Sequence, residues 1–232
     1  MKNSLFLIIA LLIFSCNKKE KDLVVKVNIN GLKKGTVYLK KLDDSTLVTV
    51  DSLVINGNSQ IELSSDLESP EVFYLYLDKN SAENDRITFF ADKGLTEINT
   101  TLKNFAFDAK IKGSKQQNKL EEYLSVISKM NNRDLDLFKE QFDSQKNGDS
   151  VKLDSLLKEA DRNLKRKYLY TVNFALNNKD SEVAPYLALT EIYNAQLKFL
   201  DTISVSLTPE VKASKYGKKL ESFIDKIKEE EN

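Results

Sequence analysis

Histidine and tryptophan are absent from the 232 residues, and cysteine occurs once, at Cys16. Without histidine, neither a Ser-His-Asp nor a Cys-His catalytic arrangement can form. A single cysteine also excludes an intrachain disulfide, a C-x-x-C redox pair and a thiolate zinc site. Any catalysis would have to depend on carboxylates, Lys, Tyr or Ser, and no motif marks such a site. We therefore expect no catalytic residues, no metal and no cofactor.

Phosphate-binding loops and a strong net charge are also absent. The seven glycines form neither G-x-G-x-x-G nor G-x-x-x-x-G-K-[ST]. Basic and acidic residues number 35 each and are interspersed, which is typical of a solvated surface and not of a nucleic-acid interface. The hydrophobic content of 41% predicts a folded core.

The N-terminal stretch MKNSLFLIIALLIFSC predicts the location of the protein. Lys2 is followed by an apolar run, Leu5–Phe14, which as a helix would rise only about 15 Å. That is too short for a hydrocarbon core of about 30 Å, so residues 1–15 are interpreted as an export signal. Ile13-Phe14-Ser15-Cys16 resembles a bacterial lipobox, which implies cleavage before Cys16 and a lipid on that cysteine. The alternative is an ordinary signal peptide with a chance cysteine.

Residues 16–22 are predicted to be a lipidated polar tether that keeps the folded body near the bilayer. By analogy with lipoprotein sorting, Asn17 after the cysteine is compatible with release to the outer membrane. We therefore expect a lipid-anchored protein of the bacterial cell envelope, on the periplasmic or the outer face of the outer membrane.

Residues 23–112 predict an antiparallel β-sandwich, because apolar residues alternate with polar ones between regularly spaced turns. About eight strands are expected, with Asn56-Gly57-Asn58 as a hairpin turn. Glu71–Leu77 is apolar on both faces, so one face is expected in the sandwich core and the other beneath helices. The last strand is expected at Phe105–Ile111.

Residues 113–232 predict an all-helical region, so the fold class is α+β. Ser114 and Gln117 form a capping-box pattern, and Asn131-Asn132 is expected to interrupt the helix that follows. Thr208-Pro209-Glu210 predicts another helix start. The apolar stripes are interpreted as core, and they include Leu135, Phe138 and Phe142.

Several short motifs resemble one family. They are the I-x-G-S sequence at Ile111–Ser114, V-A-P-Y at Val183–Tyr186 and S-L-T-P-E at Ser206–Glu210, which follow the lipobox and the predicted sandwich. Together they resemble the uncharacterised N-terminal domain of thioredoxin-like, TlpA-type lipoproteins. In that family a thioredoxin module follows, whereas this sequence has no W-C-x-x-C. The resemblance therefore implies the architecture and the compartment, but no redox residue.

Five Asp-Ser/Thr triplets resemble O-glycosylation motifs of some bacteria, with acceptor positions Ser45, Ser52, Ser150, Ser155 and Thr202. The alternative is that these aspartates cap helices and shape turns.

Three hypotheses for function remain. The favoured one is a non-catalytic, lipid-anchored binding or scaffolding module, with a separate thioredoxin-like protein as a possible partner. The second is a glycan- or ligand-binding accessory protein, and the third is a hydrolase that uses carboxylates such as Asp43/Asp44 or Asp134/Asp136. Asn132, Asp134 and Asp136 match the start of a calcium loop, but Leu137 stands where that loop needs Gly.

The last helix carries an apolar stripe, Tyr216, Leu220, Phe223 and Ile227, with the spacing i, i+4, i+7 and i+11. The favoured interpretation is that it packs on the protein's own helices. The alternative is that it docks a partner protein.

Overall fold

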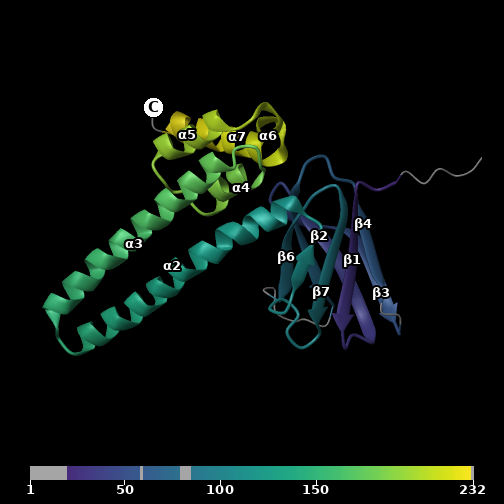
Figure 1. Ribbon diagram of the computed structural model, residues 1–232, viewed down its shortest axis with the longest axis horizontal. Coiled ribbons are helices and arrows are strands. Elements are labelled where there is room, and N and C mark those ends of the chain that lie inside the picture. Colours follow the sequence, from purple (N-terminus) through teal and green to yellow (C-terminus); the bar gives the residue numbers. More distant parts are fainter. Residues whose placement is uncertain (1–19, 58–59, 79–84, 231–232) are drawn as a thin grey trace, which may run out of the picture.

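The computed structural model describes residues 20–57, 60–78 and 85–230. In these ranges eight strands form two sheets, and six helices follow them (Figure 1). The predicted fold class, a β-sandwich followed by a helical region, is confirmed. The change from strand to helix falls between Lys112 and Lys115. Cys16 lies outside the described residues.

The sandwich consists of two four-stranded sheets. Sheet A has the order β4 (Ile61–Ser65), β1 (Leu23–Asn30), β7 (Gly94–Thr101) and β8 (Lys110–Lys112). Sheet B has the order β3 (Thr46–Asn56), β2 (Lys34–Asp43), β5 (Glu71–Leu77) and β6 (Arg86–Ala91). Inward side chains of both sheets form one core, which includes Val25, Leu39, Phe73, Leu75 and Ile98.

Three predictions for the sandwich are wrong in detail. The turn at Asn56-Gly57 does not join a hairpin, because β3 pairs with β2 in sheet B while β4 pairs with β1 in sheet A. The other two concern strand direction and strand length. First, β1 and β7 pair in parallel, because the chain reaches β7 by crossing from sheet B at Asp92-Lys93 and not through a hairpin from β1. Second, the strand predicted over Phe105–Ile111 is reduced to β8, and residues 103–108 form turns. Phe105 lies in this turn, but its side chain is buried in the sandwich core, which accounts for an apolar residue outside a strand. Its carbonyl oxygen accepts a hydrogen bond from Thr100 Oγ1 at 2.6 Å.

Strand β5 is buried on both faces along most of its length, as predicted. Phe73, Leu75 and Leu77 face the sandwich core, while Val72 and Tyr74 pack against the helices. Tyr76 differs from the expectation, since it lies beside Lys40, whose Nζ is 4.7 Å from the ring centroid.

Two long antiparallel helices, α2 (Lys115–Lys146) and α3 (Ser150–Asn177), form a hairpin. Ser114 caps α2 as predicted, because its Oγ accepts from the backbone N–H of Gln117 at 2.9 Å. The Gln117 side chain instead accepts from the Phe90 N–H at 2.8 Å and so joins α2 to β6. The predicted break at Asn131-Asn132 is wrong: both asparagines are exposed on a continuous helix, where they cost only a few tenths of a kcal/mol each.

The interpretation of Leu135, Phe138 and Phe142 as core residues is also wrong. These side chains are 68%, 70% and 61% exposed, while Leu137 is buried in their place. Periodicity alone could not separate the two rows, because each has helical spacing and they differ by a single residue.

Four shorter helices complete the chain: α4 (Val183–Thr190), α5 (Leu197–Ser206), α6 (Pro209–Ala213) and α7 (Lys215–Glu230). Thr208 caps α6 as predicted. The buried ring of Phe90 on β6 makes edge contacts with Tyr186 of α4 and Tyr216 of α7, at 5.5 and 5.7 Å between centroids. These contacts bind the helices to the outer face of sheet B. Within the described ranges, no helix is both long and apolar enough to cross a membrane.

Candidate functional site

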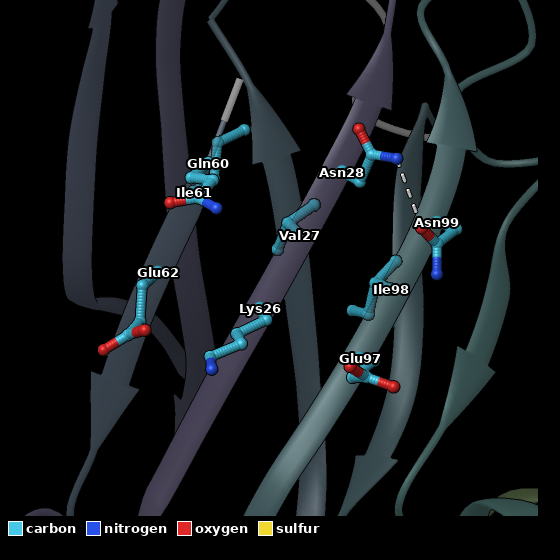
Figure 2. Close-up of a pocket in the computed structure, with 9 residues that line it drawn as sticks. All are labelled: Lys26, Val27, Asn28, Gln60, Ile61, Glu62, Glu97, Ile98 and Asn99. Carbon is cyan, nitrogen blue, oxygen red and sulfur yellow. Dashed lines mark hydrogen bonds between the residues drawn. The ribbon is translucent and has the colours of Figure 1, made fainter. Parts of the chain in front are cut away.

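The outer face of sheet A carries a groove of 410 Å³ across β4, β1 and β7 (Figure 2). Its floor is the backbone around Val27, Ile61 and Ile98, whose side chains belong to the buried sandwich core. Successive residues of a strand point to opposite faces, so the residues beside these three stand outward. They are Lys26, Asn28, Gln60, Glu62, Glu97 and Asn99, and all six are exposed. The alternation that builds the core therefore also builds the groove.

Charges of opposite sign alternate across the groove. The strand register places Lys26 opposite Glu62 of β4 and opposite Glu97 of β7, and Glu97 opposite Lys112 of β8. Neighbouring strands lie about 4.8 Å apart, so each charge has an opposite charge beside it. Such exposed pairs contribute only about 0.2–1 kcal/mol each to stability. The row is thus a patterned surface that a ligand can contact without disrupting the fold.

A second row of the groove is uncharged. Asn28 Nδ2 donates to Asn99 Oδ1 at 3.3 Å, the bond drawn as a dashed line in Figure 2. Amide side chains offer both donors and acceptors. The described residues that line the groove include no aromatic ring. The site is therefore suited to hydrogen bonds and ion pairs with an extended polar segment, and not to stacking.

The hollow continues toward the beginning of β1. A neighbouring depression of 620 Å³ shares Lys26 and Glu62 with the groove and is also lined by Glu20, Lys21 and Leu95. Residues 20–22 belong to the predicted tether, so this end of the groove lies beside the segment that leads to Cys16.

A further depression of 620 Å³ lies at the junction of the sandwich and the helices, and Asp92, Glu182 and Glu210 line it. Asp92 Oδ2 accepts from Ser114 Oγ at 3.1 Å and from the Gln116 N–H at 3.1 Å, so it satisfies the start of α2. Glu182 Oε2 accepts from Gln116 Nε2 at 2.6 Å. Burial raises the pKa of Glu182, and the nearby carboxylates raise it further. Asp92 and Glu182 thus bond the start of α2 at the junction. The described residues contain no group of three or more His, Cys, Asp or Glu side chains that could hold a metal.

The apolar stripe on the last helix packs against the protein's own core. Tyr216 is largely buried, and its hydroxyl accepts from the Val72 N–H at 3.0 Å. Leu220 is fully buried, and Phe223 and Ile227 pack partly buried on the same helical cluster. Burial raises the pKa of Tyr216 above its ordinary range. This placement agrees with the favoured interpretation of the stripe.

All five predicted glycosylation positions are exposed, namely Ser45, Ser52, Ser150, Ser155 and Thr202. The capping alternative holds for Asp149, which accepts from the Lys152 N–H at 3.0 Å, and Asp154 and Asp201 form ion pairs with Lys158 and Lys228. Glycosylation stays a prediction.

The acidic pairs singled out in the sequence lie apart from the groove. Asp43 and Asp44 are at the exposed turn between β2 and β3, and Asp134 accepts from Lys167 Nζ at 2.8 Å within the α2–α3 hairpin. Sequence reasoning did not single out the groove residues. The signal that could have found them is the run of charged and amide residues at alternate positions of the three strands.

The described chain is thus a two-sheet sandwich with a groove on the outer face of sheet A and helices packed on the outer face of sheet B. Residues 23–120, which comprise the sandwich and the start of α2, match the family model described as "Domain of unknown function (DUF4369)". No curated protein and no solved structure matches the chain.

Proposed function

We propose that this protein is a non-catalytic binding module of the bacterial cell envelope, anchored by a lipid on Cys16, which holds a partner through the groove on sheet A. The observation that carries the proposal is the contrast between the two sheets. Helices cover part of the outer face of sheet B, whereas no described helix lines the groove on the outer face of sheet A, which is hollow and patterned with charge.

The chemistry of the groove supports a protein segment as the occupant. A peptide in extended form presents backbone donors and acceptors together with alternate side chains. The asparagines can bond the former, while Lys26, Glu62 and Glu97 can pair with charges of either sign. A separately encoded thioredoxin-like protein is the partner class that the family resemblance suggests.

Anchoring is tested by Cys16→Ala. We expect the wild-type protein to incorporate a clickable fatty acid and to sediment with membranes, and we expect the variant to do neither. Lipid label that persists on the alanine variant would contradict the anchor.

The groove is tested by Lys26→Glu, which converts the row Glu62–Lys26–Glu97 into three adjacent negative charges. Its control is Lys152→Glu, an exposed lysine at the distal end of the hairpin. We expect proximity labelling in the envelope to lose one specific protein with Lys26→Glu, by about tenfold or more, and to keep it with the control. Identical labelling profiles for both variants would contradict binding at the groove.

The second candidate is a glycan-binding accessory protein, and one observation favours it. Tyr38 and Tyr76 lie opposite each other on the outer face of sheet B, and the ammonium of Lys40 is 5.5 and 4.7 Å from their ring centroids. Such rings could stack on a sugar if Lys40 moved aside. Binding of an envelope polysaccharide that Tyr76→Ala abolishes and Lys26→Glu leaves intact would support this candidate over the first.

A further inference from the structure

The half of the α2–α3 hairpin that is remote from the sandwich carries an exposed apolar surface. We call Leu135, Phe138, Phe142, Leu157 and Leu164 the distal face. Their side chains are between 44% and 70% exposed. Single exposed apolar residues are common, but five large ones on one half of a hairpin, two of them phenylalanine, form a cluster of the kind that marks an interaction site.

Helix α2 has two rows with coiled-coil spacing. The first row, Tyr123, Ile127, Met130, Leu137 and Ser144, lies against α3, where Asn163 Nδ2 donates to the Met130 carbonyl oxygen at 3.0 Å. The second row lies one residue further along the helix and contains Leu124, Leu135, Phe138 and Phe142, which follow positions 123, 134, 137 and 141 of the first spacing. One residue turns a helix by about 100°. A helix at a corner of a four-helix bundle contacts two neighbouring helices through two rows that are nearly at a right angle, as here.

Helix α3 has the same arrangement. Its contact row includes Leu156 and Asn163, and a shift of one residue leads to Leu157 and Leu164. Because the two helices are antiparallel, moving one residue toward the C-terminus from the contact row leads to the same side of the hairpin in α2 and in α3. The opposite shift leads to Arg133, Glu140 and Glu159, which meet in ion pairs of 2.9 and 2.8 Å on the other side. The hairpin therefore has one charged side and one apolar side.

Among the described residues, those that cover the apolar side lie near the body of the protein. There Tyr168, Val172 and Leu176 of α3 pack in one cluster with residues of α4, α5 and α7. Figure 1 shows that these helices lie at the end of the hairpin close to the sandwich, while the turn between α2 and α3 extends away from both. Within the described chain, the distal face lacks the helices that would complete a bundle.

We propose that the distal face binds the same face of a second copy of this chain, so that two hairpins form a four-helix bundle. From Leu124 to Phe142 the helix rises about 27 Å, and two helices side by side are about 20 Å wide. The apolar row of α2 from Leu124 to Phe142, of which the distal face is the outer part, thus covers on the order of 500 Å² in projection, which is a small interface beside the roughly 800 Å² per subunit of a standard one.

Charge complementarity supports the second copy and indicates its orientation. Lys139 and Lys146 flank the distal face along α2, and Asp154 and Asp161 flank it along α3. A two-fold axis parallel to the helices places α2 opposite the partner's α3, so the lysines of each subunit meet the aspartates of the other. The two aspartates pair with Lys158 and Lys165 on the exposed surface, and each carboxylate retains a second oxygen for an intersubunit pair.

The first test is disulfide cross-linking of the full chain in its own membranes. Phe138→Cys places a cysteine close to the proposed axis, and Glu140→Cys places one on the charged side as its control. We expect oxidation to convert most of the Phe138→Cys protein to a covalent dimer and to leave Glu140→Cys and the wild type, which has only Cys16, as monomers. Equal dimer formation by both variants, or by neither, would overturn the proposal.

The second test is sedimentation of the detergent-extracted protein. Phe138→Glu with Phe142→Glu should raise the dissociation constant of the dimer by at least about 100-fold. The control is Phe107→Glu with Val205→Glu, which changes exposed apolar residues elsewhere and should leave the dimer intact. Circular dichroism verifies that both variants fold. A monomeric wild type would overturn the proposal. It would also be overturned if the only defect of the Phe138→Glu, Phe142→Glu protein were weaker binding to anionic lipid vesicles, because the distal face would then contact the membrane.

Discussion

Phe90→Ala is expected to lower the free energy of unfolding by about 3–5 kcal/mol. The Phe90 ring is completely buried between β6 and the helices, and it contacts Tyr186 and Tyr216 edge to face. Its removal leaves a cavity at the centre of the contact between sandwich and helices. The backbone bond from Phe90 to Gln117 should persist, because it does not involve the ring.

The matched comparison is Phe89→Ala, which removes the same ring from the neighbouring residue. Phe89 points to the other side of sheet B, where it stacks on Phe73 at 6.0 Å between centroids. We expect a similar loss of stability by denaturant titration but a different pattern of hydrogen exchange. Phe90→Ala should increase exchange in α4 and α7, whereas Phe89→Ala should increase it in the strands of the sandwich. A loss below about 1 kcal/mol for Phe90→Ala would contradict the packing of the helices on sheet B.

Gly113→Ala is expected to destabilise the protein by about 3 kcal/mol or more, since two costs combine. Gly113 has φ +99°, a region that alanine adopts only with strain. A Cβ at this position would also lie 2.1 Å from the Leu95 carbonyl oxygen, and a backbone atom of β7 cannot move aside as a flexible side chain would. The chain leaves β8 and enters α2 at this residue, so the clash acts on the connection between the two parts.

Gly94→Ala separates the two costs. Gly94 has φ +108°, but a Cβ there would meet nothing within 4 Å. We expect this variant to lose only the conformational cost of about 1–2 kcal/mol. Thermal unfolding of both variants checks the difference. Equal losses would mean that the close approach of Gly113 to β7 does not limit stability.

Local patterns in the sequence were sufficient to predict the fold class. Strand periodicity placed Glu71–Leu77 in the interior, and the structure buries it on both faces for most of its length. The caps at Ser114 and Thr208 were predicted correctly because each depends on side chains within three residues of the cap. The absence of histidine and the single cysteine likewise limit the chemistry of the protein, whatever its fold.

The parallel pair β1–β7 and the open face of sheet A could not be predicted in this way. They depend on which strands become neighbours after the chain crosses between sheets, and no residue within a few positions of β1 encodes that choice. The groove residues Lys26, Glu62 and Glu97 are typical exposed strand residues until the register places them side by side. Alternation in the sequence thus indicated that polar side chains would face outward, but only the pairing of strands decided which of them meet.

The same distinction applies to the helices. The sequence by itself determined that the segments of α2 and α3 would be helical and amphipathic, because their apolar residues recur with helical spacing. It could not decide which of two rows, one residue apart, would face the partner helix. Tertiary packing placed Leu137 in the interior and left Leu135, Phe138 and Phe142 outside. The physical reason is that a period identifies the faces of a helix, whereas burial depends on the neighbours that the rest of the chain brings to each face.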